Sequence, residues 1–148
     1  MTIMEATLTE AIAAQVIALS GDWEKEHSCH GYRKSTPEDL QGNRIFLAVH
    51  DGAVVGYLLG HQEVKTEATS VYPAGTKCFE IEELYVKPEL RGQGIGKSLF
   101  RFVETEAAED CEMIVLTTPT KNYRAILHFY IDELDMEFWS ARLFKRIK

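Results

Sequence analysis

The stretch IEELYVKPELRGQGIGKSLF, residues 81–100, decides the fold that we expect for this chain. It begins as an apolar strand that Pro88 ends, and an apolar stripe with helical spacing starts just after Gly94. Between the two, glycines at alternate positions free the backbone, and a helix N-terminus offers unpaired N–H donors and partial positive charge. Such a junction binds anions, and Arg91 adds a charged contact. The sequence therefore predicts a phosphate-binding loop between a strand and a helix.

Two common phosphate-binding loops do not fit the spacing of these glycines. The P-loop pattern also ends in glycine, lysine and serine, but it needs a further glycine where this chain has Arg91. A dinucleotide loop has the pattern G-x-G-x-x-G and an acidic residue at the end of the next strand, where this chain has Thr117 and Thr118. A glycine-rich stretch that merely turns the chain is the simplest alternative.

The N-terminal part of the chain predicts one strand and two helices. Residues 2–6 are a candidate strand, and a helix follows that starts with a capping box between Thr7 and Glu10 and closes at Gly21. The stretch after it has no period and predicts a loop or a broken helix. Residues 35–40 predict a short helix, because a threonine cap is followed by proline at the first position.

The middle of the chain predicts strands. The segments 44–50 and 53–60 flank Asp51 and Gly52, which together are a strong hairpin signal. The segment 78–86 is a third strand, and it leads directly into the glycine-rich loop.

Helices and strands alternate after the loop. Residues 94–109 predict a helix, 112–118 a buried strand and 122–134 another helix, while the alternation in 136–147 favours one or two final strands. This order of elements predicts a mixed α/β sheet with helices on both faces.

The composition is that of an ordinary soluble globular protein. The chain has 148 residues, of which 45% are hydrophobic and 26% charged, so it fits a single domain spanning residues 1–148. Its net charge of −7 opposes binding to nucleic acid or anionic membranes and favours a cationic small partner. The three cysteines form no paired motif and we find no targeting or membrane-spanning segment, so we expect a cytoplasmic protein with reduced thiols.

Residues 81–100 as a whole strongly resemble the central motif of the GNAT superfamily of acyl-CoA-dependent N-acetyltransferases. Arg91, Gly94 and Gly96 fill the signature Arg/Gln-x-x-Gly-x-Gly/Ala, which follows a Val-x-Pro-like turn. The segment 122–139 resembles the second motif of the family, in which an asparagine opens a helix that carries a tyrosine. The resemblance covers roughly residues 44–140. It implies a GNAT-like, mostly antiparallel sheet with a splayed central strand pair, and acetyl-CoA as the co-substrate that brings the phosphates.

The resemblance also implies which residues contact acetyl-CoA. The strand backbone would bind the pantetheine arm, and the loop with the helix start would bind the pyrophosphate. A family bulge that helps to splay this strand would fall at Glu82 and Glu83, which disturb its alternation, although both could simply face solvent on an edge strand. The residues expected at the acetyl-CoA site are Leu84, Tyr85, Val86, Arg91, Gly92, Gln93, Gly94, Ile95, Gly96, Lys97, Ser98 and Asn122.

Acetyl transfer needs a base, because an amine with a pKa near 10 is only about one part in a thousand neutral at pH 7. A carboxylate can take the proton directly or through a water. The family pattern implies Glu80, while Glu82 is nearly as plausible because a regular pleat would give both the same face. Glu83 is a third candidate, and solvated strand carboxylates are the alternative for each.

The leaving CoA thiolate needs a proton donor, and Tyr130 resembles the general acid of the family. The family usually has this tyrosine one position earlier, where this chain has Phe129. Asp135 corresponds to a position that is usually glycine in the family, and it comes later in the sequence by one more residue. Irregular winding of the helix would absorb both shifts. The alternative is that Tyr130 packs in the core beside Phe129.

The predicted reaction is direct attack of the amine on the thioester, because positioning with a base and an acid suffices. Asp22, Glu24 and Glu26 lie where the family builds its acceptor site, which favours a polyamine-like or aminoglycoside-like acceptor over an acidic or neutral one. The sequence does not name the acceptor, and an antibiotic, a polyamine, an amino acid and a protein amine all stay open. The alternative is a GNAT-fold module that binds acyl-CoA without turnover. We expect no metal, since the histidines near Cys29 lack a second ligand pair, and the apolar C-terminal strands could pair in a homodimer.

Overall fold

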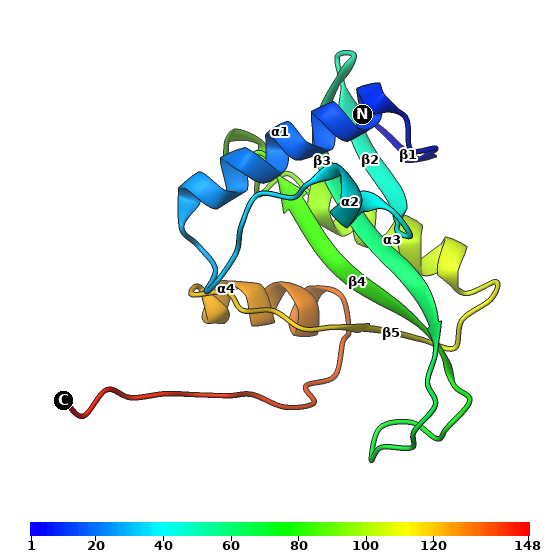
Figure 1. Cartoon of the computed structure of the whole chain (residues 1–148), viewed down its shortest axis with the longest axis vertical. Coiled ribbons are helices and arrows are strands. Elements are labelled where there is room, and N and C mark those ends of the chain that lie inside the picture. Colours follow the sequence, from blue (N-terminus) through cyan, green and yellow to red (C-terminus); the bar gives the residue numbers. More distant parts are fainter.

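The computed structural model describes all 148 residues and consists of a five-stranded sheet between layers of helices (Figure 1). The strands lie in chain order, with antiparallel pairing from β1 to β4 and a parallel pair between β4 and β5. This confirms the predicted mixed, mostly antiparallel sheet. The strands are β1 (Thr2–Ala6), β2 (Arg44–His50), β3 (Ala53–Val64), β4 (Lys77–Val86) and β5 (Met113–Leu116).

The parallel pair β4–β5 separates halfway along β4. Pairing joins Cys78–Ile81 to Met113–Leu116 and goes no further, so the end of β4 from Glu82 onward has no neighbour on that side. At the same point β4 has a bulge, because Leu59 faces Glu83 while Gly60 faces Ile81. A Cβ at Gly60 would lie 2.6 Å from the carbonyl oxygen of Glu80, so only glycine fits opposite the bulge. The predicted splay and bulge are both confirmed.

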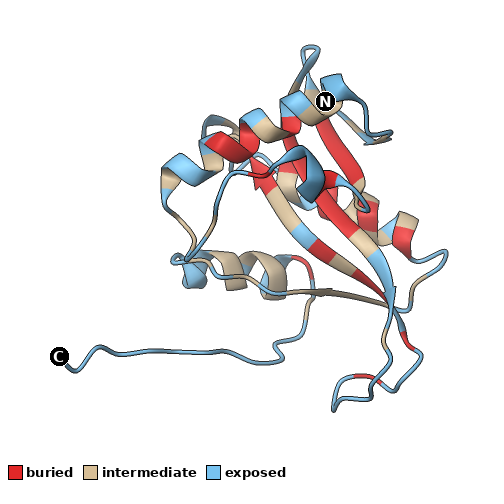
Figure 2. Ribbon diagram, viewed as in Figure 1, coloured by how far each residue is buried: buried red, intermediate tan, exposed pale blue.

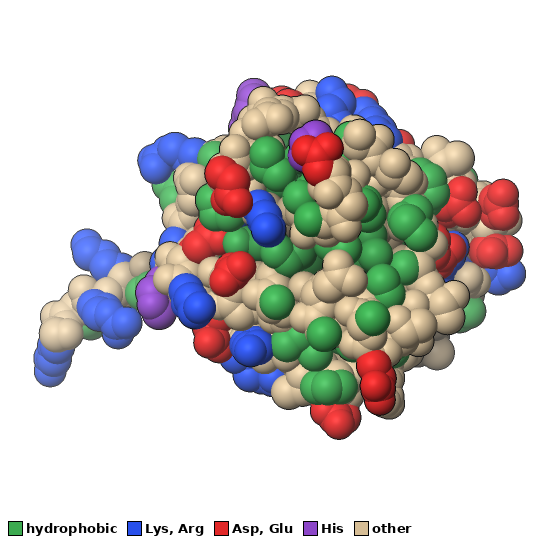
Figure 3. Space-filling model, turned by 90° about the horizontal axis from the view of Figure 1, so that it is seen from above, with side chains coloured by type: hydrophobic (Ala, Val, Ile, Leu, Met, Phe, Trp, Pro, Cys, Tyr) green, Lys and Arg blue, Asp and Glu red, His purple; other side chains and the backbone are tan.

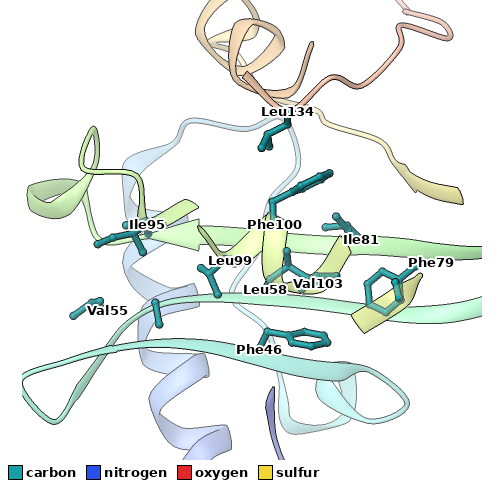
Figure 4. Close-up of a cluster of buried hydrophobic side chains, with 13 residues drawn as sticks. Phe46, Val55, Leu58, Phe79, Ile81, Ile95, Leu99, Phe100, Val103 and Leu134 are labelled. Atoms are coloured by element: carbon teal, nitrogen blue, oxygen red, sulfur yellow. The ribbon is translucent and has the colours of Figure 1, made fainter. Parts of the chain in front are cut away.

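Helices cover both faces of the sheet. The helices α1 (Glu10–Glu26) and α2 (Pro37–Leu40) cross one face, and α3 (Ile95–Ala107) lies behind the other (Figure 1). Buried residues concentrate on the central strands and on the helix faces that touch them (Figure 2). The α1 side of the core includes Val16, Leu19, Leu40, Leu47 and Tyr57, and the α3 side includes Phe46, Leu58, Phe79, Leu99 and Val103 (Figure 4).

The first helix differs from its prediction at both ends. Its N-cap is Thr9, whose hydroxyl accepts from the amide of Ile12, so the expected capping box at Thr7 is wrong. The helix also continues through Gly21 to Glu26. Tertiary contacts hold this last part, because Trp23 stacks on two tyrosines and Glu26 binds an arginine of the glycine-rich loop. Neither contact can be read from local sequence.

The last helical region is irregularly wound. The short α4 (Tyr123–Leu127) continues directly into η2 (His128–Glu133), a π-helical segment that contains Tyr130. A π-turn holds more residues than an α-turn, so it takes up the extra residue that displaces this tyrosine along the sequence. Asp135 adopts a left-handed conformation with φ of 61°, which explains why a glycine would be usual there.

The C-terminal segment, residues 137–148, forms no strand. The prediction of one or two strands over 136–147 is wrong, and the chain runs extended away from the body (Figure 1). Only two ring contacts touch the body, Trp139 against Tyr72 and Phe144 against His30, at 5.7 and 5.8 Å between centroids. Alternation gives a segment two faces, but a strand also needs a hydrogen-bonding partner. No helix of the molecule has the length and apolar character to cross a bilayer.

Candidate active site

Two hollows lie on opposite sides of the bulged end of β4. The loop hollow, of about 310 Å³, lies between the start of α3 and the α4–η2 region. The acidic hollow, of about 470 Å³, lies beneath the segment that joins α1 to α2. Glu82 and Glu83 line the acidic hollow, and Leu84 and Val86 line the loop hollow. The free end of β4, from Glu82 to Val86, therefore borders both hollows.

The start of α3 is open and has free backbone donors. Gly94 is the N-cap of α3 with φ of 85°, and no side chain caps the exposed N–H groups. A Cβ built at Gly94 would meet no atom within 4 Å, so the glycine is needed for its backbone conformation and leaves room in front of the helix. Free donors and the helix dipole make this a suitable place for a phosphate group.

Most of the residues expected at acetyl-CoA line the loop hollow, but four do not. The four are Tyr85, Gln93, Ser98 and Asn122. Tyr85 faces the opposite side of the sheet, where its hydroxyl donates to Glu26, so only its backbone remains for a pantetheine arm. The expected residues that line the hollow are Leu84, Val86, Arg91, Gly92, Gly94, Ile95, Gly96 and Lys97, and sequence reasoning missed Leu90, Ile126, Phe129 and Glu133.

Arg91 lines the loop hollow but is already engaged. Its guanidinium donates to both carboxylate oxygens of Glu26, at 2.8 and 2.9 Å, and its Nε donates to the carbonyl of Val86. Burial acts to raise the pKa of Glu26, but hydrogen bonds from Arg91 and Tyr85 bring that pKa below its usual value. The arginine therefore ties the end of α1 to the glycine-rich loop.

The three candidate bases on β4 have different surroundings. Glu80 lies where β4 still pairs with β5, near Lys65, and one of its carboxylate oxygens is buried without a hydrogen-bond partner. Burial raises its pKa. Glu82 is the extra residue of the bulge, is 47% exposed, and lies 3.5 Å from Nδ1 of His61. The bulge thus directs Glu82 into the acidic hollow beside an imidazole.

Glu83 is the buried centre of a hydrogen-bond network. It accepts from the hydroxyls of Tyr57 at 2.7 Å, Ser35 at 3.1 Å and Tyr32 at 3.2 Å. Burial nevertheless raises the pKa of Glu83, and burial also raises the pKa of Tyr32 to about 12. This carboxylate joins the α1–α2 segment to β3 and β4. Because it accepts three hydrogen bonds, its oxygens are largely occupied.

Tyr130 lines the loop hollow from η2. Its ring contacts Phe129 and Phe100, so it packs in the core and borders the hollow at the same time. Burial raises its pKa. The hydroxyl therefore keeps its proton at neutral pH.

The acidic residues expected near an acceptor do not all reach the acidic hollow. Asp22, Glu24 and Glu26 lie on the last turns of α1, and none of them lines it. Glu24 accepts from the amide of Lys34, and Glu26 binds Arg91. The carboxylates that do line it, Asp39, Glu82 and Glu83, come from α2 and β4. His61, which sequence reasoning also missed, has no local motif that would reveal it.

Comparison with known proteins gives the family. The model of the acetyltransferase (GNAT) family matches residues 14–133. Among solved structures, the ribosomal-protein-alanine N-acetyltransferase of Brucella melitensis is 19% identical with a TM-score of 0.69, over 99% of this chain and 100% of that one. An aminoglycoside acetyltransferase from an uncultured soil metagenomic sample, in complex with sisomicin, is 17% identical with a TM-score of 0.73, over 99% and 96%. An aminoglycoside N-acetyltransferase in complex with CoA is 16% identical with a TM-score of 0.65, over 99% of both chains.

A search of curated protein sequences finds no significant match. Solved structures of such low identity show only that the fold is shared, whereas the family match shows that the chain is a member of the family. This chain belongs to the acetyltransferase (GNAT) family and is an acetyl-CoA-dependent acetyltransferase. The family, the fold and the co-substrate predicted from the sequence are thus confirmed.

Proposed function

We propose that this protein moves an acetyl group from acetyl-CoA to an amine of a small cationic acceptor by direct attack. Acetyl-CoA would bind in the loop hollow and the acceptor in the acidic hollow. The observation that carries this proposal is that neighbouring residues of the bulged end of β4 line the two hollows, Glu82 and Glu83 the acidic one and Leu84 and Val86 the other. An amine and a thioester that enter from opposite sides would reach the same point.

The charge of the acidic hollow supports a cationic acceptor. Asp39, Glu82 and Glu83 line it, and Arg33, which pairs with Asp39 at 3.0 Å, is the only lysine or arginine that does. An excess of carboxylates raises the local concentration of cations. A solved relative of this fold was crystallised with sisomicin, an aminoglycoside. A second positive group on the acceptor would remain as an anchor after the reacting amine has lost its proton.

The proposed chemistry uses one group from each side of β4. Of the three strand carboxylates, Glu82 is the one free to take part in removing the proton of the amine, because Glu83 accepts three hydrogen bonds and Glu80 lies before the splay. Tyr130 would protonate the leaving thiolate from the loop hollow. The loop glycines and the α3 N-terminus would hold the pyrophosphate.

We infer one domain over residues 1–148, a cytoplasmic setting consistent with three free cysteines, and no nucleic-acid or membrane partner for a chain of net charge −7. We also propose a homodimer formed through the apolar C-terminal segment, whose exposed side chains include Phe138, Leu143 and Phe144.

The test is a panel of amines offered with acetyl-CoA while release of the CoA thiol is followed. The panel holds spermidine and sisomicin as multiply charged acceptors, a mono-cationic alkylamine, and zwitterionic amino acids, each at two salt concentrations. We expect the multiply charged amines to have the highest kcat/KM and to lose rate at high salt. If no amine makes thiol release faster than it is with acetyl-CoA alone, the proposed reaction is refuted. A preference for zwitterions would refute the proposed acceptor class.

A further inference from the structure

His61 is the one imidazole that lines the acidic hollow. It lies on β3 directly opposite Glu80, next to the bulge of β4. Its Nδ1 faces two oxygens, Oδ1 of Asn43 at 3.4 Å and Oε1 of Glu82 at 3.5 Å. Because both neighbours of Nδ1 are acceptors, the proton of the neutral ring belongs on Nδ1, and Nε2 keeps its lone pair. The side chain is 34% exposed, so part of the ring has access to water.

A carboxylate alone is a poor match for the proton of an ammonium group. Carboxylates ordinarily have pKa values near 4 and amines near 10, whereas general bases work best when they titrate close to the operating pH. Imidazole is the side chain that ordinarily changes protonation between pH 5 and 8. We propose that His61 is the general base that deprotonates the acceptor amine, and that Glu82 is its positioning residue. This inference rests on the proposed function above.

Each proton in the proposed reaction has a donor and an acceptor. The acceptor ammonium gives one proton to Nε2 of His61, and the neutral amine attacks the thioester carbon. The C–N bond forms, the C–S bond breaks, and the CoA thiolate takes the proton of Tyr130. The second proton of the amine restores the tyrosine hydroxyl, and the imidazolium returns its proton to water. Overall the reaction releases one proton.

The groups around His61 suit a ring that becomes positively charged during turnover. Oε2 of Glu63, on the same strand, lies 4.0 Å from Nε2, and Glu82 faces the other nitrogen. Lys65 is a nearby positive charge that would disfavour a charged imidazole, but it pairs with Glu63 at 3.0 Å and lies 4.0 Å from Glu80. The titratable and charged groups that face His61 or line the same hollow are Glu63, Lys65, Glu80, Glu82, Glu83, Asp39, Arg33 and Tyr32. Carboxylates outnumber cations among them.

The experiment compares pH profiles of kcat/KM for wild type, His61→Gln, Glu82→Gln and the control His50→Gln, using the best acceptor of the panel. His50 is an exposed histidine at the end of β2 that pairs with Asp51 and lines neither hollow. We expect the kcat/KM of wild type and of the control to rise with pH through one inflection and then level off, as a single titrating base requires. His61→Gln should lose about 10²-fold or more near neutral pH. Its rate should climb about tenfold per pH unit, following the neutral fraction of the amine.

Glu82→Gln should lower the rate but keep the inflection, because it removes only the positioning partner. An inflection lost in Glu82→Gln and kept in His61→Gln would make the carboxylate the base and overturn the proposal. Equal profiles for His61→Gln and wild type would also overturn it, while leaving the acetyltransferase function intact. CoA affinity, measured by calorimetry, should be the same in all four proteins. Absence of turnover with every amine would instead be a failure of the proposed function.

Discussion

At the scale of single residues, Gly94 allows the sharpest test of the acetyl-CoA site. Gly94→Asp would add a negative charge in front of α3, at the position proposed for the pyrophosphate, so we expect CoA binding to be lost. Its φ of 85° also makes any side chain strained. The control is Gly75→Asp, since Gly75 has φ of 88° and equally open space but lies in the loop between β3 and β4.

Calorimetry with CoA and thermal melts of both variants separate strain from binding. Both variants should lose similar stability, and only Gly94→Asp should lose affinity. Unchanged CoA affinity in Gly94→Asp would rule out the loop hollow as the phosphate site.

Tyr130 can be tested by removing a single oxygen. Tyr130→Phe keeps the ring contacts with Phe129 and Phe100 and removes only the proton donor. We expect kcat to fall about 10²–10⁴-fold if the hydroxyl protonates the thiolate, with CoA affinity unchanged. The matched control is Tyr123→Phe, an exposed tyrosine at the start of α4. Normal turnover of Tyr130→Phe would mean that the thiolate leaves unaided or is protonated by another group.

At the scale of elements, the bulged end of β4 buries the carboxyl group of Glu83, and ionising this group costs stability. Burial raises the pKa of Glu83 above its usual value, so the folded state holds the proton of this carboxyl more tightly than the unfolded chain does. The corresponding stability is complete below the ordinary carboxyl pKa of about 4.3 and is lost as pH rises through the higher folded-state pKa.

Glu83→Gln removes this titration while it keeps an oxygen that can accept from Tyr57. We therefore expect its melting temperature, relative to wild type, to rise as pH increases from about 4 to about 8. The exposed loop substitution Glu67→Gln should follow wild type throughout. A difference that is constant with pH, or that grows toward acid, would contradict the buried-carboxylate explanation.

At the scale of the whole molecule, the C-terminal segment is the part with least contact to the rest. It projects from the body with several lysine and arginine side chains (Figure 3). This segment has a net charge of +3, from the four basic residues Arg142, Lys145, Arg146 and Lys148 and the one acidic residue Glu137. Since the whole chain carries −7, the rest of the molecule carries −10. A basic apolar segment and an acidic body are complementary, and the outer edge of β5 has no partner.

We expect the protein to be a dimer in solution and Leu143→Asp to be a monomer. Leu143 is 90% exposed, so the change costs an isolated chain little but would place a charge in an apolar contact between two chains. Light scattering after gel filtration measures the mass, and Val71→Asp, at an exposed apolar residue of the loop between β3 and β4, is the control. A monomeric wild type, or a dimeric Leu143→Asp, would contradict pairing through this segment.

The sequence by itself determined the features that depend on a few neighbouring residues. The hairpin at Asp51 and Gly52, the short helix capped by Thr36 and the glycine-rich start of α3 are fixed by turn chemistry, capping and backbone freedom. Two irregular features were also visible in the sequence, as a disturbed alternation at Glu82 and as a tyrosine, Tyr130, displaced by one position from the family pattern. They appear in the structure as a bulge and a π-helical segment.

Only the tertiary structure decided which distant residues meet. The extension of α1 to Glu26 depends on Arg91, and the pairing of His61 with Glu82 depends on the register between β3 and β4. In the C-terminal segment the alternating pattern was present, but no neighbouring strand lies within hydrogen-bonding reach. The physical reason is the same in each case. Backbone preferences act over a few residues, whereas hydrogen bonds and ion pairs between elements exist only where packing brings the two partners together.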